Sequence, residues 1–151
     1  MKVIGNTTDT ARQLHIELEE TIEAPIERVF TAMIDEFSDW FPHRFITGSS
    51  VRSEVRLGGP TWEDWGDGQG ILQSLLTAYR KPDLAAMVAF GGLFGNWWGQ
   101  WTYRFQTADG GTLVKLSIYL MGDLTDDLAD MYLNGWPGLF AAVREHLSIG
   151  A

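Results

Sequence analysis

The sequence contains no cysteine. This absence excludes disulfides, thiolate metal ligands and thiol nucleophiles together, and it fits a cytoplasmic protein. Basic residues are also few, because 11 Lys and Arg stand against 20 Asp and Glu, for a formal net charge of −9. Nucleic acids and anionic membrane surfaces attract Lys and Arg, so this balance predicts no nucleic-acid partner. No apolar run reaches the ~20 residues of a membrane span, so no membrane insertion is expected.

The 151 residues are 45% hydrophobic, which suits one domain with a substantial core. The polar start of the chain predicts a flexible tail over residues 1–12. A single domain is then expected over residues 13–149.

Apolar and polar side chains alternate between Leu14 and Ile22, the period of a half-buried strand. Pro25 predicts the start of a helix that runs to about Ile34, because proline is well tolerated at a first helical position. A second short helix is expected from Asp35 to Phe41. Further strands are expected at 51–57, 61–65, 70–79, 85–90, 97–106 and 112–120.

A long amphipathic helix of about 25 residues is expected at the C-terminal end, where apolar residues recur at helical spacing. Asp123 is the predicted N-cap, with Asp126 in the first turn. Pro137 lies inside this pattern and predicts a kink, because it lacks a backbone N–H.

Several short segments carry a family resemblance through their order and spacing. They are Ile22-Glu-Ala-Pro-Ile-Glu-Arg-Val-Phe30, Trp40-Phe-Pro, Gly58-Gly59, Gly70, Gly111-Thr112 and Gly135-Trp136. Over about residues 14 to 147, the chain resembles the family similar to the C-terminal domain of the activator of the Hsp90 ATPase. That family lies within the START-like (SRPBCC, Bet v 1-like) superfamily.

The resemblance implies an α+β helix-grip fold. In this fold a curved antiparallel sheet of about six or seven strands wraps a long C-terminal helix, and two short helices follow the first strand. Such folds commonly enclose an apolar cavity between sheet and helix. Members bind lipids, sterols, polyketides or aromatic compounds, and some are cyclases or hydrolases, so the fold alone does not choose a function.

The segment "GNWWGQWTYRF" (residues 95–105) concentrates aromatic rings on one strand. Alternation places four rings on the face toward the long helix, together with Gly99, and leaves Trp98 on the outer face. The inward rings are Trp97, Trp101, Tyr103 and Phe105. They are either ordinary core or the wall of a ligand cavity, in which Gly99 would leave room between two indoles.

We interpret the sequence as a protein that binds a small hydrophobic or aromatic molecule in this cavity, without catalysis and without a cofactor. Glu20 lies on the apolar face of the first strand and is expected to orient a polar end of the ligand. The other candidate lining residues are Phe37, Trp40, Phe41, Trp62, Trp65, Trp97, Trp101, Tyr103, Met131, Gly135 and Trp136.

Two alternatives remain open. In an enzyme, Glu20 or His43 would transfer protons inside the same cavity. In a protein-interaction module of co-chaperone type, the core would be filled by its own rings, and Trp98 would contact a partner or form a homodimer through the outer sheet face. A metal site is not expected, because the three histidines show no ligand spacing and the acidic loop around Asp64 does not complete an EF-hand.

Overall fold

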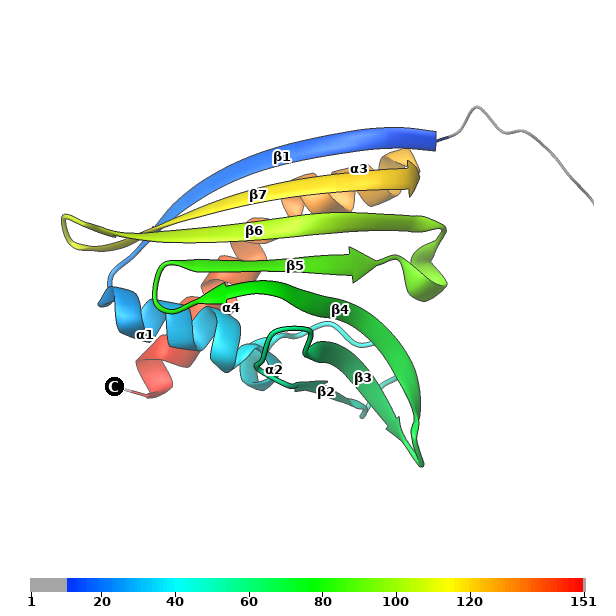
Figure 1. Cartoon of the computed structure of the whole chain (residues 1–151), viewed down its shortest axis with the longest axis horizontal. Coiled ribbons are helices and arrows are strands. Elements are labelled where there is room, and N and C mark those ends of the chain that lie inside the picture. Colours follow the sequence, from blue (N-terminus) through cyan, green and yellow to red (C-terminus); the bar gives the residue numbers. More distant parts are fainter. Residues whose placement is uncertain (1–10, 151) are drawn as a thin grey trace, which may run out of the picture.

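The computed structural model describes residues 11–150, in which seven antiparallel strands form one curved sheet with helices against one face (Figure 1). The strands are β1 (Ala11–Ile22), β2 (Ser50–Ser53), β3 (Pro60–Gly66), β4 (Gln69–Arg80), β5 (Leu84–Phe90), β6 (Trp97–Ala108) and β7 (Gly111–Asp123). The helical elements are α1 (Ile26–Phe30), η1 (Thr31–Asp35), α2 (Phe37–Trp40), η2 (Gly92–Phe94), α3 (Asp126–Asn134) and α4 (Trp136–Ile149). The strand order β1-β7-β6-β5-β4-β3-β2 leaves β1 and β2 at the two edges. The predicted helix-grip architecture is confirmed.

The first strand begins two residues earlier than the expected domain boundary. Ala11 and Arg12 pair with Asp123 and Gly122 of β7, and Arg12 Nη1 lies 2.7 Å from the Asp126 carboxylate. The remaining residues of the expected tail, 1–10, lie outside the described residues.

A continuous helical segment follows β1 and closes one end of the sheet. Pro25 precedes α1 as predicted, and the chain then widens into the π-helical turn η1 before the single turn of α2. Val29 and Phe30 of α1 are completely buried. The segment is therefore anchored to the core by its apolar side, as its sequence pattern predicts.

The expected strand over residues 51–57 is too long, because β2 ends at Ser53. The chain turns there: the Gly59 N–H donates to the Arg56 carbonyl, and a Cβ on Gly59 would lie 1.9 Å from the Glu54 carbonyl oxygen. Val55 and Leu57, which we expected to belong to this strand, lie in the turn and are exposed. Their alternating pattern belongs to a tight turn in which glycine is required.

The long C-terminal helix is confirmed as two segments, α3 and α4, which meet at Gly135 next to Pro137. The break agrees with the expected effect of Pro137. The predicted N-cap Asp123 is wrong, because it is the last residue of β7. Thr125 caps α3 instead, and its hydroxyl accepts a hydrogen bond from the Leu128 N–H at 3.2 Å.

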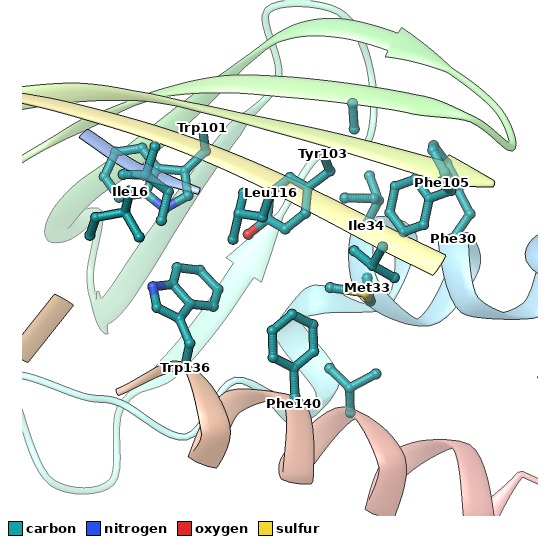
Figure 2. Packing of buried hydrophobic residues seen from close by; sticks show 14 of the residues in the cluster. Ile16, Phe30, Met33, Ile34, Trp101, Tyr103, Phe105, Leu116, Trp136 and Phe140 are labelled. Atoms are coloured by element: carbon teal, nitrogen blue, oxygen red, sulfur yellow. The ribbon is translucent and has the colours of Figure 1, made fainter. Parts of the chain in front are cut away.

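The core lies between the inner face of β1, β5, β6 and β7 and the helices (Figure 2). Trp136 and Phe140 of α4 point toward the sheet, while the Phe30 ring packs edge-on against Phe105 at 5.0 Å. The alternation predicted for β6 is confirmed, because the rings at 97, 101, 103 and 105 are buried and Trp98 is exposed. Strand register therefore sets which rings can reach an interior site.

Candidate functional site

Trp97 and Trp101 of β6, which we expected to line a ligand cavity, are packed as part of the core. The Tyr132 ring of α3 meets both indoles edge-on, with centroids 5.5 Å from Trp97 and 5.9 Å from Trp101. Burial alone raises the pKa of Tyr132. Within the described residues, the buried Trp97 Nε1 has no hydrogen-bond partner. These contacts fill the space in which we expected a ligand.

Gly99 leaves no gap between the two indoles. A Cβ built there would lie 2.4 Å from the Tyr119 carbonyl oxygen, 2.5 Å from Leu120 Cδ2 and 2.8 Å from the Trp101 ring. The expectation of open space at this glycine is wrong, because the side chains of Trp101 and Leu120 already occupy it. Glycine is needed here for close packing between β6 and β7.

A cavity does exist further along the sheet, between the helical segment and the β2–β4 end. Its volume is about 40 Å³. Figure 2 shows Tyr103 of β6 on its sheet side and Met33 and Ile34 of η1 on its helical side. The lining residues are Met33, Ile34, Phe37, Ser53, Glu54, Val55, Gly59, Thr61, Ser74, Leu76, Met87 and Tyr103.

One wall of this cavity carries a row of hydroxyl groups. Ser53 pairs with Thr61 across β2 and β3, and Thr61 pairs with Ser74 across β3 and β4. The Ser53 and Thr61 hydroxyl oxygens are 3.0 Å apart. The next cross-strand partners in this row are Ala89 on β5 and Gly99 on β6, which carry no hydroxyl group. Polar groups on this wall therefore face apolar side chains of η1 and α2.

Tyr103 of β6 also lines this cavity. Its side chain is almost completely buried, and burial alone raises the pKa of its phenol. The phenol therefore stays protonated over the physiological pH range and can donate a hydrogen bond. The cavity thus combines apolar walls with a few placed polar groups, as small-molecule sites commonly do.

The structure brings together only part of the predicted site. Phe37 and Tyr103 line the cavity. Phe41 lies just outside it and stacks on Phe37 with ring centroids 4.6 Å apart. Trp40 packs against the core, and its Nε1–H donates to the Ala32 carbonyl at 2.7 Å. Of these three aromatic residues, Phe37 alone lines the cavity.

Glu20 does not reach the cavity. It lies on the inner face of β1, but its carboxylate pairs with Arg144 of α4, which also donates to the Thr21 carbonyl. The predicted ligand-orienting role is therefore wrong, because the carboxylate is already held by a guanidinium at the rim of the sheet. The sequence pattern predicted that Arg144 lies on the C-terminal helix, but nothing in it indicated the ion pair with Glu20.

The two tryptophans predicted on β3 lie on opposite faces, because an odd separation along a strand reverses the side chain. Trp65 donates its Nε1–H to Glu63 at 3.2 Å. Trp62 instead lines an open hollow of about 400 Å³ on the surface of the β3–β4 hairpin, together with Asp64 and Leu72. That hollow is open and is lined largely by exposed residues of the hairpin turn, so we favour the smaller cavity as the ligand site.

The three lining residues expected on the C-terminal helix differ in burial. Trp136 is buried and packs against the Phe140 ring at 6.2 Å, as part of the core. Met131 and Gly135 were expected to line the cavity, and that expectation is wrong because both are exposed.

Sequence reasoning missed the role of Glu63, which we considered only as part of an acidic loop. Its side chain is completely buried and accepts hydrogen bonds from the backbone N–H groups of Phe45 (2.8 Å) and Ile46 (2.9 Å) and from the Ser49 hydroxyl (2.6 Å). Burial raises the pKa of Glu63, but these donors outweigh it and hold the pKa below its usual value. Glu63 thereby fixes the loop that follows α2.

The groups proposed for acid–base chemistry lie away from the cavity. His43 is exposed in the loop after α2, with its ring edge-on to Phe41 at 5.3 Å. The one carboxylate on the cavity lining is that of Glu54, which pairs with Arg56 at 2.8 Å and is half exposed. Among residues 11–150, no three His, Asp or Glu side chains are close enough to hold a metal ion.

No helix within the described residues is long and apolar enough to cross a membrane. No protein-family model matches the sequence, and no curated protein is significantly similar to it. The membership predicted in the Hsp90-activator family stays a prediction.

Solved structures do resemble this one closely. Ara h 8.0201 superposes with a TM-score of 0.69 at 20% identity, over 90% of this chain and 98% of that one. A protein from Rhizobium leguminosarum gives 0.69 at 20% identity, over 94% and 99% of the two chains. DynU16, from the dynemicin biosynthetic locus, gives 0.67 at 17% identity, over 90% of this chain and 48% of that one. At such identities the likeness concerns the fold, and this chain therefore has the Bet v 1-like, START-like helix-grip fold.

Proposed function

We propose that this protein binds a small hydrophobic or aromatic molecule carrying at least one polar group, in the cavity between the helical segment and the β2–β4 end of the sheet, without catalysing a reaction on it. The observation that carries the proposal is the mixture of apolar and hydroxyl-bearing residues in the cavity lining. Met33 and Phe37 contribute apolar surface, and Ser74 and Tyr103 are among the hydroxyl-bearing residues.

The size of the cavity requires it to open when a ligand binds. Its volume of about 40 Å³ is far below the ~300 Å³ at which pockets for drug-sized molecules begin. Phe37 is the side chain best placed to move, because α2 is a single turn of four residues and Phe37 is only partly buried. We therefore expect the ligand to displace the Phe37 ring and to stack against the aromatic groups around it.

The polar wall sets which ligands are favoured. Ser53, Thr61 and Ser74 can each donate and accept, and the Tyr103 phenol stays protonated because burial raises its pKa. A carbonyl, hydroxyl or ether oxygen on a flat apolar body satisfies this wall. A fully charged group does not, because the described lining offers no buried counter-charge. The expected location in the cytoplasm remains part of this proposal.

Titration with a panel of uncharged aromatic compounds, such as naphthols and flavonoids, tests the proposal through calorimetry and tryptophan fluorescence. We expect saturable binding at one site. Met33→Trp should abolish it by filling the cavity, whereas Met131→Trp, at an exposed methionine on α3, should leave it unchanged. Equal effects of the two variants, or no binding by any compound, would overturn the proposal.

A second variant keeps the test meaningful if Met33→Trp fails to fold. Ser74→Ala removes one cavity hydroxyl with little change in volume. It should weaken binding of oxygen-bearing ligands by about fivefold, which corresponds to one hydrogen bond of roughly 1 kcal/mol. Apolar analogues without the oxygen should bind the variant as well as they bind the wild type. Native mass spectrometry of protein purified from its own host would then identify the natural ligand.

A further inference from the structure

The outer face of the sheet carries a cluster of exposed aromatic and apolar side chains at the end next to η2. Phe90 of β5 lies directly opposite Trp98 of β6, and Trp98 lies directly opposite Met121 of β7. Tyr119 follows on β7 and is 56% exposed, while Trp98 is 50% exposed. We name this surface the Trp98 patch, and it comprises Val88, Phe90, Trp98, Gln100, Tyr119 and Met121.

The Trp98 patch contains no charged residue. Its cross-strand neighbours Leu75 on β4 and Gln13 on β1 are uncharged as well. The chain as a whole carries 31 charged residues among 151, so about one charge would be expected at six positions and none is present. Depletion of charge together with enrichment in Trp, Tyr, Phe and Met is the composition of an interface core.

Charged side chains lie at the border of the Trp98 patch and at the opposite end of the same sheet face. His15 stacks on the Tyr119 ring with centroids 4.0 Å apart and contacts Glu17 at 2.5 Å. Further along, Lys115 of β7 lies beside Arg104 of β6 and 3.3 Å from the Glu19 carboxylate of β1. An uncharged centre with a polar border is the arrangement found in stable protein–protein interfaces.

The chemistry of the patch selects its partner. It offers no Lys or Arg to an anionic lipid or nucleic acid, and no carboxylate to a basic protein. A partner with an uncharged apolar surface is therefore favoured. A second copy of this chain presents that surface by definition, and a two-fold axis near Trp98 would place the two rows of side chains face to face.

We propose that the protein forms a two-fold symmetric homodimer through the Trp98 patch. Phe90, Trp98, Tyr119 and Met121 are between 37% and 56% exposed, so even complete burial of the patch stays below the ~800 Å² per partner of a standard interface. We therefore expect the dimer to be weak. This inference is independent of the ligand cavity, which lies on the inner face.

The net charge of −9 per copy adds a testable property. Two acidic copies repel each other at long range, and dissolved salt screens that repulsion. The uncharged contact itself has no ion pairs for salt to weaken. Association should therefore become stronger as the salt concentration rises, which is opposite to the behaviour of an interface held by salt bridges.

Sedimentation equilibrium over a range of protein and salt concentrations tests the proposal. The wild type should approach twice its 16.9 kDa monomer mass as concentration rises. Trp98→Lys should weaken association at least about tenfold, because a central tryptophan is a typical hot spot. Leu57→Lys is the matched control: it places the same charge at an apolar side chain that is 68% exposed but lies in the β2–β3 turn. Circular dichroism should show both variants folded.

A mixing experiment identifies the partner as a second copy. Trp98→Lys and Trp98→Glu should each be monomeric alone, and an equimolar mixture should regain dimers because opposite charges then meet across the two-fold axis. A wild type that stays monomeric throughout would overturn the proposal. So would equal weakening by Trp98→Lys and Leu57→Lys, or a mixture that regains no dimer.

Discussion

A methyl group on Gly99 would occupy space that is already taken by the Tyr119 carbonyl oxygen and the Leu120 side chain. We therefore expect Gly99→Ala to lower the free energy of unfolding by about 1–3 kcal/mol, the usual cost of overpacking a dense core. Backbone conformation adds nothing to this cost, because Gly99 does not have a positive φ angle. Urea denaturation measures the change.

Gly138→Ala provides the control for this prediction. A Cβ on Gly138 meets no atom within 4 Å, and the residue lies inside α4. Alanine is a better helix former than glycine by up to ~1 kcal/mol, so this variant should be neutral or slightly more stable. A destabilised Gly138→Ala together with an unaffected Gly99→Ala would contradict the packing argument.

Single residues are also where sequence reasoning reached its limit. Alternation along β6 correctly predicted which rings face the helices, because the period of a strand is fixed by its backbone. It could not predict that the Trp101 ring folds back over Gly99, because side-chain rotamers depend on the whole packed core. The gap predicted from a missing side chain was therefore wrong.

At the scale of an element, the loop between α2 and β2 is held by one buried carboxylate on β3. Glu63→Gln keeps the size of the side chain but turns an NH₂ donor toward groups that are themselves donors. We expect a loss of about 2 kcal/mol of stability near pH 7, since hydrogen bonds to a charged group are the stronger ones. Glu54→Gln, at a half-exposed carboxylate, should cost much less.

The pH dependence of this loss gives an independent check. The pKa of Glu63 is lower in the folded protein than its ordinary value. A lowered folded pKa contributes stability that is fully present above the unfolded pKa and is lost as the pH falls through the folded pKa. The difference in unfolding free energy between wild type and Glu63→Gln should thus shrink in acid. A difference that is independent of pH would show that Glu63 acts through packing alone.

The elements themselves were largely predictable. The order of strands and helices follows from apolar periods and from turn residues such as Pro25 and Gly110, and the structure confirms it. The boundary errors at β2 and α3 have different causes. Glu54 begins a turn in which its N–H donates to the nearby Pro60 carbonyl, whereas Asp123 ends β7 by donating to the distant Asn96 carbonyl. The local sequence around Asp123 does not contain that partner.

At the scale of the whole molecule, an ion-pair network closes the C-terminal helix onto the helical segment. Glu36 directly follows η1. Its Oε2 lies 2.7 Å from Arg28 Nη1 of α1 and 2.6 Å from His146 Nε2 of α4. Burial raises the pKa of Glu36, but the hydrogen bonds from Arg28 and His146 outweigh it, so the pKa lies below its ordinary value. Residues from both ends of the described chain therefore meet at one carboxylate.

We expect Glu36→Gln to lower the unfolding free energy by under about 1 kcal/mol near pH 7, because about a third of the side chain is exposed and solvent screens the pair. Since the folded pKa is lowered, the stabilisation is present above the unfolded pKa and disappears as the pH falls through the folded one. Thermal unfolding of both proteins at neutral and acidic pH measures the difference. An undiminished deficit in acid would contradict the assignment.

The site as a whole could not be predicted from the sequence, although the fold could. The family resemblance implied a cavity between sheet and helix, and Phe37 and Tyr103 were placed correctly beside one. The remaining volume depends on how Tyr132 fills the tryptophan end and on how the turn after β2 brings Val55 to the opposite end. Both result from contacts between segments that are far apart in sequence.

The two walls of the cavity differ in how freely they can change during evolution. The hydroxyl groups of Ser53, Thr61 and Ser74 are positioned by the hydrogen-bonded register of three strands. The facing wall consists of side chains on η1 and α2, such as Met33 and Phe37, which take no part in that register. Substitutions on the helical side can therefore enlarge or reshape the cavity while the polar anchor stays in place. Relatives and engineered variants could acquire new ligands in this way without a redesign of the sheet.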